Sequence, residues 1–126
     1  MTTMTSTAPE RLTPRRGEIW LAALGKGRPG EPGKHRPVVV VSADAPDGYA
    51  AQDLIPVVPL SSSRAPSESR PSVPAREGLV NDSLAMVRAV RGIAASRLLH
   101  RLAQLEPGEL AELDYALAMS LNLLKD

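Results

Sequence analysis

The sequence predicts a mainly β fold with one C-terminal helix, arranged as a small, strongly bent antiparallel sheet or a partly open barrel. Two observations predict it. Short runs of β-branched residues alternate with Gly- and Pro-rich stretches between residues 17 and 105. After Pro107 the apolar spacing changes to that of an amphipathic helix. A chain of 126 residues has room for one domain with a modest core.

Three strands are expected in the first half of the chain. Residues 17–24 (GEIWLAAL) contain the β-favouring pair Ile-Trp. The unbroken β-branched run in residues 37–42 (PVVVVS) indicates a strand buried on both faces. Residues 53–60 (DLIPVVPL) form a third strand, which Pro56 and Pro59 restrict to a sheet edge or a bulge. Shorter strands are expected at SVPA (72–75), SLAMV (83–87), RAVRGI (88–93) and RLLHRLAQL (97–105).

The C-terminal helix is predicted by a leucine stripe. Pro107 suits the first turn of a helix, where its missing N–H costs no hydrogen bond. Glu109 and Glu112 complement the positive end of the helix dipole. The stripe that should face the core consists of Leu110, Leu113, Leu117, Leu121 and Leu124.

The chain is expected to consist of a short N-terminal leader and one domain. We expect residues 1–15 to be a disordered leader, because they are rich in Thr and Pro and lack the apolar core of a signal peptide or anchor. Residues 16–126 are expected to form a single domain. No apolar run is long enough for a membrane span, and the absence of cysteine fits a cytoplasmic location.

The charge distribution makes RNA or DNA a plausible partner. Lys and Arg exceed Asp and Glu in residues 1–36 and again in residues 60–101, whereas acids exceed bases in residues 102–126. If both basic segments face the same way, they attract polyanions, while the acidic tail lies elsewhere. A solvated surface of mixed charge is the alternative.

Several site classes are excluded by residue type. The chain has no Walker loop, no His-Glu-x-x-His pair and no zinc spacing, and its two histidines are His35 and His100. We therefore expect no metal and no cofactor. With no Phe and only Trp20, Tyr49 and Tyr115, the chain cannot build a multi-ring platform for stacked bases.

The remaining candidates are polar residues at two strand ends. Glu31, Lys34, His35 and Arg36 precede the buried strand, and Ser61–Ser63 follow the third one. Metal-free RNA cleavage needs a base for the 2′-hydroxyl, an acid for the leaving 5′-oxygen and positive charge on the phosphorane. Glu or His can be the base, and the permanently charged Arg36 suits the stabilising role. A structural role, with Arg36 and His35 ending a strand and the serines forming a turn, fits the same residues.

Three motifs resemble one known family. RGEIW at 16–20, GEPGKHRPVVVVS at 30–42 and VVPLSSS at 57–63 are similar, in order and separation, to the MazF/PemK (Kid) toxins of bacterial toxin–antitoxin pairs. The segment from residue 88 to about residue 124 resembles the family's closing strands and C-terminal helix. The combination of the first two motifs is more specific than either motif alone.

The resemblance implies an SH3-related, CcdB/PemK-like small β-barrel that forms a homodimer. It also implies a sequence-specific, metal-independent endoribonuclease, an mRNA interferase, that cleaves single-stranded RNA by 2′-hydroxyl attack. The products would be a 2′,3′-cyclic phosphate and a free 5′-hydroxyl, and a MazE-like antitoxin with an acidic segment would neutralise the toxin. The family's catalytic arginine falls on Arg36 and its catalytic Thr/Ser on Ser61, while Glu31 and His35 match positions used as acid, base or substrate contact in some members. Residues 25–33 match the mobile loop over the family's active site, and RNA contacts are expected from Lys34, Ser62, Ser63, Arg64, Arg88 and Arg91.

The chain departs from the family at one pair of residues. Arg88 and Ala89 stand where many members have an acidic residue followed by Gln, which could change the bases that are read. The same scaffold also permits a non-catalytic function, since CcdB toxins bind DNA gyrase. Their Trp-Gly-Ile end is absent here, because the chain ends in LNLLKD. An inert SH3-like interaction module is the third alternative.

Overall fold

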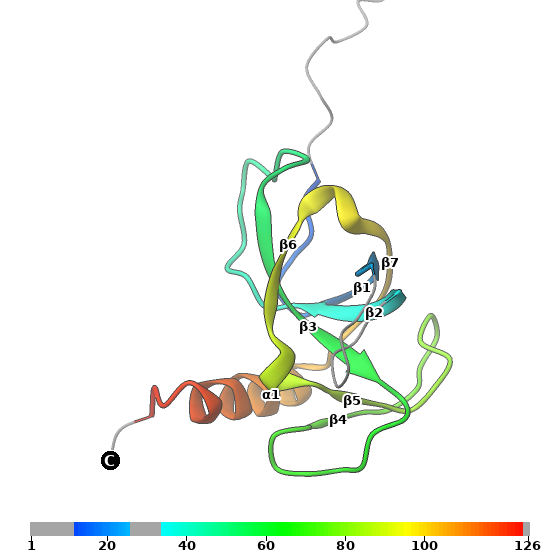
Figure 1. Cartoon of the computed structure of the whole chain (residues 1–126), viewed down its shortest axis with the longest axis vertical. Coiled ribbons are helices and arrows are strands. Elements are labelled where there is room, and N and C mark those ends of the chain that lie inside the picture. Colours follow the sequence, from blue (N-terminus) through cyan, green and yellow to red (C-terminus); the bar gives the residue numbers. More distant parts are fainter. Residues whose placement is uncertain (1–11, 26–33, 125–126) are drawn as a thin grey trace, which may run out of the picture.

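The architecture is taken from a computed structural model that describes residues 12–25 and 34–124. Strands and short helical turns alternate along these residues until one α-helix ends the fold (Figure 1). In chain order the elements are β1 (Glu18–Ala23), β2 (His35–Val40), β3 (Leu54–Ser61), β4 (Ser72–Val73), β5 (Ser83–Ala85), the 3₁₀ turn η1 (Val87–Ala89), β6 (Arg91–Ala94), the 3₁₀ turn η2 (Ala95–Arg97), β7 (Leu98–Gln104) and α1 (Pro107–Ser120).

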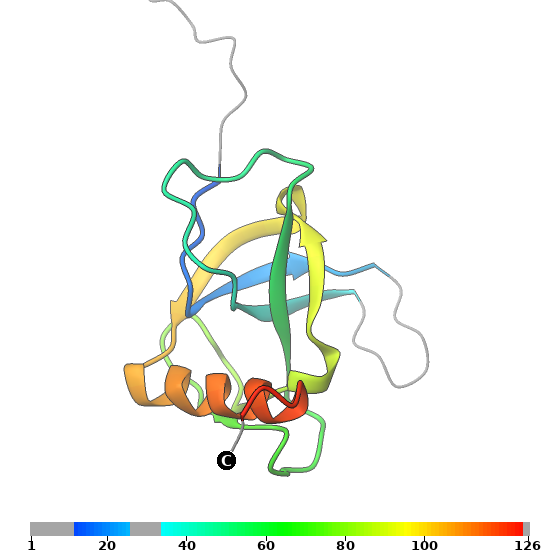
Figure 2. The same ribbon diagram turned by 90° about the vertical axis from the view of Figure 1, so that its left-hand side faces the viewer.

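All strand pairs are antiparallel, and the sheet curls into a small barrel. The sheet order is β4-β5-β3-β2-β1-β7, and β6 also pairs with β3. Because η2 joins β6 directly to β7, the strands β1, β2, β3, β6 and β7 close around a common interior. Figures 1 and 2 show α1 at one end of this barrel and the connection between β2 and β3 at the other. The expected bent sheet with a C-terminal helix is confirmed.

Strand β3 corrects one expectation, because it lies inside the sheet and not at its edge. It pairs with β2 on one side and with β6 and then β5 on the other. The Pro59 carbonyl accepts a hydrogen bond from Met86 N, so the backbone of Pro59 faces the side of β3 that pairs with β6 and β5. On that side, pairing with β6 stops at Val57 and pairing with β5 begins at Leu60. Pro56 faces the end of β2, where its carbonyl accepts from Val41 N. Each proline therefore occupies a position where the partner strand changes or ends, and no ladder hydrogen bond is lost.

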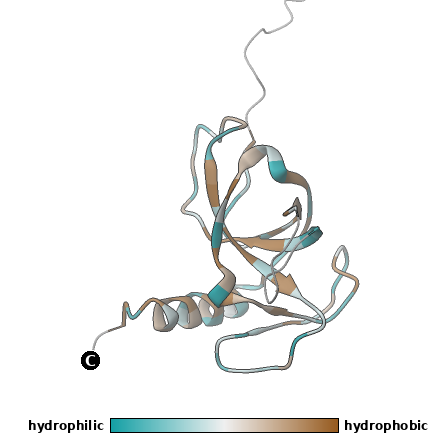
Figure 3. Ribbon diagram, in the orientation of Figure 1, coloured by the Kyte–Doolittle hydropathy of each residue, from teal (hydrophilic) through white to brown (hydrophobic). Residues whose placement is uncertain are grey.

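Two apolar clusters form the core, and β2 separates them. Val38 and Val40 belong to the cluster inside the barrel, whereas Val39 and Val41 belong to the cluster between the sheet and α1. The expected double burial of this strand is confirmed. Figure 3 shows a contrast along β2 itself: its middle is brown, and its start is teal. A hydrophilic strand end therefore continues directly into the core.

Helix α1 begins as expected and ends earlier than the leucine stripe predicts. Pro107 occupies the first turn, and Glu106 and Glu109 form a reciprocal capping box. Leu113 is buried, with Leu110 and Leu117 packed against the same cluster. The helix stops at Ser120, so the last two leucines of the stripe, Leu121 and Leu124, are exposed. The leucine stripe was therefore right for its first three members and wrong for its last two.

Several boundaries differ from the sequence prediction. His35 and Arg36, expected to precede the buried strand, are its first two residues, and the strand ends at Val40. Residues 88 and 89, expected in a strand, lie in η1, and the following strand begins at Arg91. Leu12, expected in the leader, exchanges two backbone hydrogen bonds with Tyr49 at 3.1 and 2.7 Å and packs against the barrel cluster. Residues 1–11 lie outside the described part of the chain, so the disorder expected of them stays a prediction. Within the described residues, no helix has the length and apolar character to cross a membrane.

Candidate active site

Arg36 and Ser61 lie at neighbouring strand ends. The register of β2 and β3 pairs Val38 with Pro59 and Val39 with Val58, and it ends at the first of these pairs. Arg36 and Ser61 each lie two residues beyond that last pair, at the same end of the two strands. Because side chains alternate along a strand, both are expected on the face that Val38 and Pro59 share. Arg36 is half-buried, and Ser61 is only 4% exposed. The structure thus brings together the two residues that the sequence placed at separate strand ends.

The Ser61 hydroxyl also shapes the turn that follows β3. It accepts a hydrogen bond from Ser63 N at 3.3 Å, and the hydroxyls of Ser61 and Ser63 lie 3.3 Å apart. On the other side of β3, Ser61 pairs with Leu84 of β5. Ser62, Ser63 and Arg64, the expected RNA contacts, are exposed. Ser61 therefore has the turn-forming role that the sequence left open, at a position beside Arg36.

Lys34 and His35 line a cleft at the base of the loop between β1 and β2. The Lys34 N–H bonds to the Gly25 carbonyl, and Leu24 N donates to the Lys34 carbonyl at 2.7 Å. The cleft measures about 750 Å³, and Arg97 also lines it while donating to the Ala23 carbonyl at 3.1 Å. Since side chains alternate along a strand, His35 faces away from the Arg36–Ser61 side. Glu31 and the other residues of the expected mobile loop, except Gly25, lie outside the described residues.

A smaller cavity of about 270 Å³ opens where β2 begins and β3 ends. Its polar lining comes from Arg36, Ser62, Asn81 and Ser83, and the remainder is glycine and apolar side chains. Leu60 and Ser62 line the cavity, whereas Ser61 between them does not. Because side chains alternate along a strand, the cavity lies on the face of the β3 end opposite to that of Ser61. Arg36 therefore borders both the Ser61 face and this cavity.

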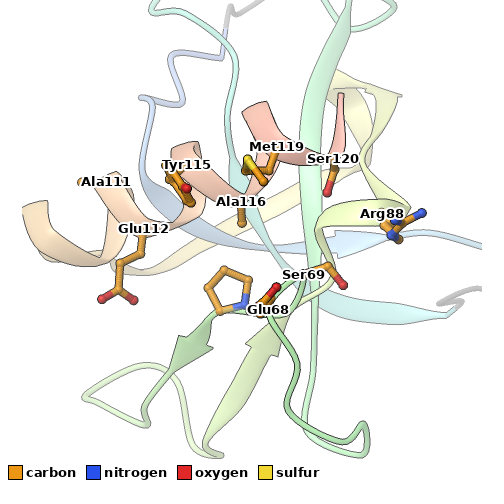
Figure 4. Close-up of a pocket in the computed structure, with 10 residues that line it drawn as sticks. Glu68, Ser69, Arg88, Ala111, Glu112, Tyr115, Ala116, Met119 and Ser120 are labelled. Carbon is orange, nitrogen blue, oxygen red and sulfur yellow. The ribbon is translucent and has the colours of Figure 1, made fainter. Parts of the chain in front are cut away.

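Arg88 and Arg91 belong to η1 and β6, respectively. Arg88 lines a groove of about 870 Å³ between α1 and the loop that follows β3. Figure 4 shows Tyr115 and Met119 on the wall that α1 provides, with Arg88 toward one end and Glu112 toward the other. Arg91 is exposed in β6, opposite Val57. Neither arginine lines the cavity beside Arg36, and their role as RNA contacts stays a prediction.

The acidic tail does not lie apart from the basic segments, contrary to expectation. Asp114 of α1 forms an ion pair with Arg16, and Glu109 forms a bidentate pair with Arg76 at 2.6 and 2.7 Å. The hydrogen bond from Arg76 is the main cause that holds the pKa of the Glu109 carboxyl below its ordinary value, although burial opposes it. Part of the basic excess is therefore neutralised by the helix.

Two contributors to these sites were not identified from the sequence. Arg97 belongs to the basic segment but carries no local motif, and the loop of residues 74–83 contains ordinary turn residues. Arg97 reaches its cleft, and the loop of residues 74–83 reaches its cavity, only because of the way the chain folds. Among the described residues, no three His, Cys, Asp or Glu side chains gather into a group that could hold a metal ion.

Comparisons with known proteins identify the family to which this chain is similar. A family model described as PemK-like, MazF-like toxin of type II toxin-antitoxin system matches residues 15–121. A relative named Endoribonuclease MazF9, from Mycobacterium tuberculosis (strain ATCC 25618 / H37Rv), is 38% identical over 115 residues, which are 86% of this chain and 97% of the relative. The residues that the family model matches, 15–121, include both Arg36 and Ser61.

Solved structures share the fold. The crystal structure of MazF from Deinococcus radiodurans has a TM-score of 0.72 at 25% identity, with 87% of this chain and 97% of that chain covered. An endoribonuclease in complex with its cognate antitoxin, from a mycobacterial species, has a TM-score of 0.70 at 20% identity, with 90% and 99% covered. At that lower identity the likeness bears on the fold alone.

Proposed function

Because the chain belongs to the family of PemK-like, MazF-like toxins of type II toxin–antitoxin systems, we propose that it is a sequence-specific endoribonuclease that cleaves single-stranded RNA, above all mRNA. The observation that carries the proposal is the position of Arg36 and Ser61, each two residues beyond the last β2–β3 pair, at the hydrophilic end of two largely buried strands. The 38% identical relative named as an endoribonuclease supports the same reaction class.

The proposed reaction is an attack of the ribose 2′-hydroxyl on the adjacent phosphorus. The bond from phosphorus to the 5′-oxygen breaks, leaving a 2′,3′-cyclic phosphate and a 5′-hydroxyl. Arg36 is suited to stabilise the phosphorane, because its guanidinium stays charged and donates two parallel hydrogen bonds to phosphate oxygens. Ser61 would donate its hydroxyl proton to a phosphate oxygen, and its Ser63 contact restricts where that hydroxyl can point.

We assign the general base and acid to the start of β2 and the segment that precedes it. His35 and Glu31 are the candidates, and the proton from the 2′-hydroxyl passes to one of them while the leaving 5′-oxygen gains a proton. His35 is exposed at the loop base, close in sequence to Arg36 but on the other side of the strand. A role as base therefore requires His35, or the loop, to reach across the strand end when RNA is bound. No metal is needed in this scheme, since the positive charge comes from arginine.

The partners follow from the family. We propose that the toxin forms a homodimer in the cytoplasm and is neutralised by a cognate MazE-like antitoxin. Large apolar side chains exposed on and after α1, such as Tyr115 and Met119, support a protein interface on this side. The relative solved with its cognate antitoxin supports the antitoxin as partner.

The proposal is tested with purified protein and a long single-stranded RNA in excess EDTA, with the cut ends mapped. A second RNA carries a 2′-deoxy sugar at the mapped site. A Ser61→Ala protein, purified in the same way, controls for contaminating ribonucleases. We expect cuts at defined sequences in chelator, loss of cutting at the deoxy position, and about a hundredfold slower cutting by Ser61→Ala at the same sites.

Three results would contradict the proposal. Cutting that persists at the deoxy sugar would exclude attack by the 2′-hydroxyl, and cutting that requires a divalent metal would exclude the metal-independent scheme. No cutting of any RNA would exclude the nuclease altogether. Gyrase binding, the non-catalytic alternative, would then be measured directly with purified DNA gyrase.

A further inference from the structure

We propose that the cavity beside Arg36 is a base-binding subsite, in which Asn81 reads the base of a nucleotide that adjoins the scissile phosphate. This inference rests on the proposed function and adds a specificity-determining residue to it. Asn81 belongs to the loop of residues 74–83, which the sequence motifs do not include.

The size and lining of the cavity fit a single base. Its volume of about 270 Å³ lies just below the ~300 Å³ at which pockets for drug-sized ligands begin, and it is large enough for a base. Its wall is mostly apolar, with Leu60, Leu79 and Leu102 among the lining side chains. Arg36 is the one charged residue among the described residues that line it. An apolar wall next to one cation suits a planar base attached to a phosphate.

Asn81 has the functional groups to distinguish one base from another. Its amide offers one acceptor and two donor hydrogens, which match the edges of an unpaired base. The side chain is exposed, and within residues 12–25 and 34–124 it makes no hydrogen bond of its own. The Asn81 backbone, in contrast, is fixed, because its carbonyl accepts from the Ser83 hydroxyl at 3.0 Å. A fixed backbone with an unoccupied amide group is suited to recognition.

The loop that carries Asn81 is held rigidly against the rest of the fold. Arg76 N and Leu79 N each donate to the other residue's carbonyl, at 2.9 and 2.8 Å. The Arg76 side chain donates to the Gln104 carbonyl at 3.0 Å and to both carboxylate oxygens of Glu109. Gly78 lies so close to Leu102 that an added Cβ would be 1.8 Å from the Leu102 carbonyl oxygen. The cavity wall is therefore formed before RNA binds, which favours selective recognition.

The path of the RNA connects this cavity to the reacting phosphate. Arg36 lines the cavity and also lies at the same end of the β2–β3 pair as Ser61. A strand of RNA that crosses the end of β3 from the Ser61 face to the Ser62 face would place its phosphate at Arg36. The neighbouring base would then enter the cavity, within reach of Asn81.

The test compares cleavage of an RNA pool of random sequence in EDTA by wild type, Asn81→Ala, Asn81→Asp and the control Gln52→Ala. Gln52 is an exposed amide in the connection between β2 and β3, remote from the cavity in sequence and absent from its lining. Sequencing of the cut ends gives the base preference at each position. Thermal unfolding of each protein accompanies the assay and should give wild-type midpoints, since the replaced side chain is exposed.

We expect Asn81→Ala to lower the base preference at one position beside the cut by at least about fivefold, the low end of what one bidentate base contact contributes. Asn81→Asp, which replaces donors by an acceptor, should change the order of preferred bases at that position. Gln52→Ala should keep the wild-type profile. If wild type cuts specifically and both Asn81 variants keep its profile, even at a uniformly lower rate, the inference is wrong while the proposed function stands. If wild type cuts no RNA, both are wrong.

Discussion

Replacing Glu109 by Gln should loosen the contact between α1 and the loop of residues 74–83. The Glu109 Oε1 atom accepts from Arg76 Nη1 at 2.7 Å and from Glu106 N at 2.8 Å, while Oε2 accepts from Arg76 Nη2 at 2.6 Å. A glutamine oxygen can keep the first two bonds. Its amide nitrogen, however, would face the Arg76 Nη2 donor with a second donor.

The expected loss of stability follows from these contacts. One charge-assisted hydrogen bond contributes about 1.5–3 kcal/mol, and the side chains of Arg76 and Glu109 are 20% and 19% exposed, so screening reduces this only in part. Loss of a negative charge in the first turn of the helix removes about 0.3–1 kcal/mol more. We therefore expect Glu109→Gln to lower the free energy of unfolding by about 2 kcal/mol at pH 7.

Urea unfolding measures this change, with Glu112→Gln as the matched control. Glu112 lies on the same helix, is exposed, and carries the same charge. With an m-value of about 1.5 kcal/mol/M, Glu109→Gln should lower the midpoint by roughly 1 M, and Glu112→Gln should change it by less than about 0.3 M.

The pH dependence tests the cause. The pKa of Glu109 in the folded protein is lowered, chiefly by the hydrogen bond from Arg76. The stabilisation is therefore complete above the ordinary glutamate pKa of about 4.3 and is lost as the pH falls through the lower, folded-state pKa. The difference between wild type and Glu109→Gln should shrink as the pH falls from about 5 toward 3. Equal midpoints for the two variants at pH 7, or a difference that survives at low pH, would refute the reasoning.

Two further substitutions test the packing, each with its own control. Leu113 is 1% exposed, so Leu113→Ala should lower the free energy of unfolding by about 3 kcal/mol. Leu121 lies beyond the helix and is 52% exposed, so Leu121→Ala should change that free energy by less than about 0.5 kcal/mol. Equal losses for the two variants in thermal or urea unfolding would show that the helix ends later. Gly78→Ala should cost at least about 2 kcal/mol, because the residue has φ +92° and the new Cβ would meet the Leu102 carbonyl. Gly108→Ala, where a Cβ meets nothing within 4 Å, should leave stability unchanged or raise it by about 0.5 kcal/mol. A tolerated Gly78→Ala would contradict the close approach of the loop to β7.

The sequence predicted those parts of the fold that depend on one segment alone. The valine run required burial on both faces, and the leucine spacing after Pro107 required a helix. The sequence did not predict what depends on partners. Pro56 and Pro59 suggested an edge strand because nothing local shows that β3 changes partners beside each proline. The end of α1 was not predicted, because Leu121 keeps the helical spacing of the leucines although the helix itself stops at Ser120.

The residues of the candidate site come from local motifs, and their relative positions come from the fold. Arg36 and Ser61 each belong to a motif of their own, but only the pairing of β2 with β3 shows that both lie at the same end of neighbouring strands. Asn81 carries no motif and reaches the cavity because its loop is held by Arg76 and Gly78. Arg88, grouped with the RNA contacts by charge, lies in a different groove because η1 turns it toward α1.

The most direct test of the central claim is the single-turnover rate of cleavage at one mapped RNA site by Arg36→Ala, beside wild type and Arg101→Ala. Arg101 is an exposed arginine paired with Glu18, and its removal makes the same change in net charge. We expect Arg36→Ala to be slower by about 10²–10³-fold, with a free energy of unfolding within about 1 kcal/mol of wild type, and Arg101→Ala to cleave at nearly the wild-type rate. Cleavage by folded Arg36→Ala at the wild-type rate, or equal losses for both variants, would contradict a catalytic role for the Arg36–Ser61 pair.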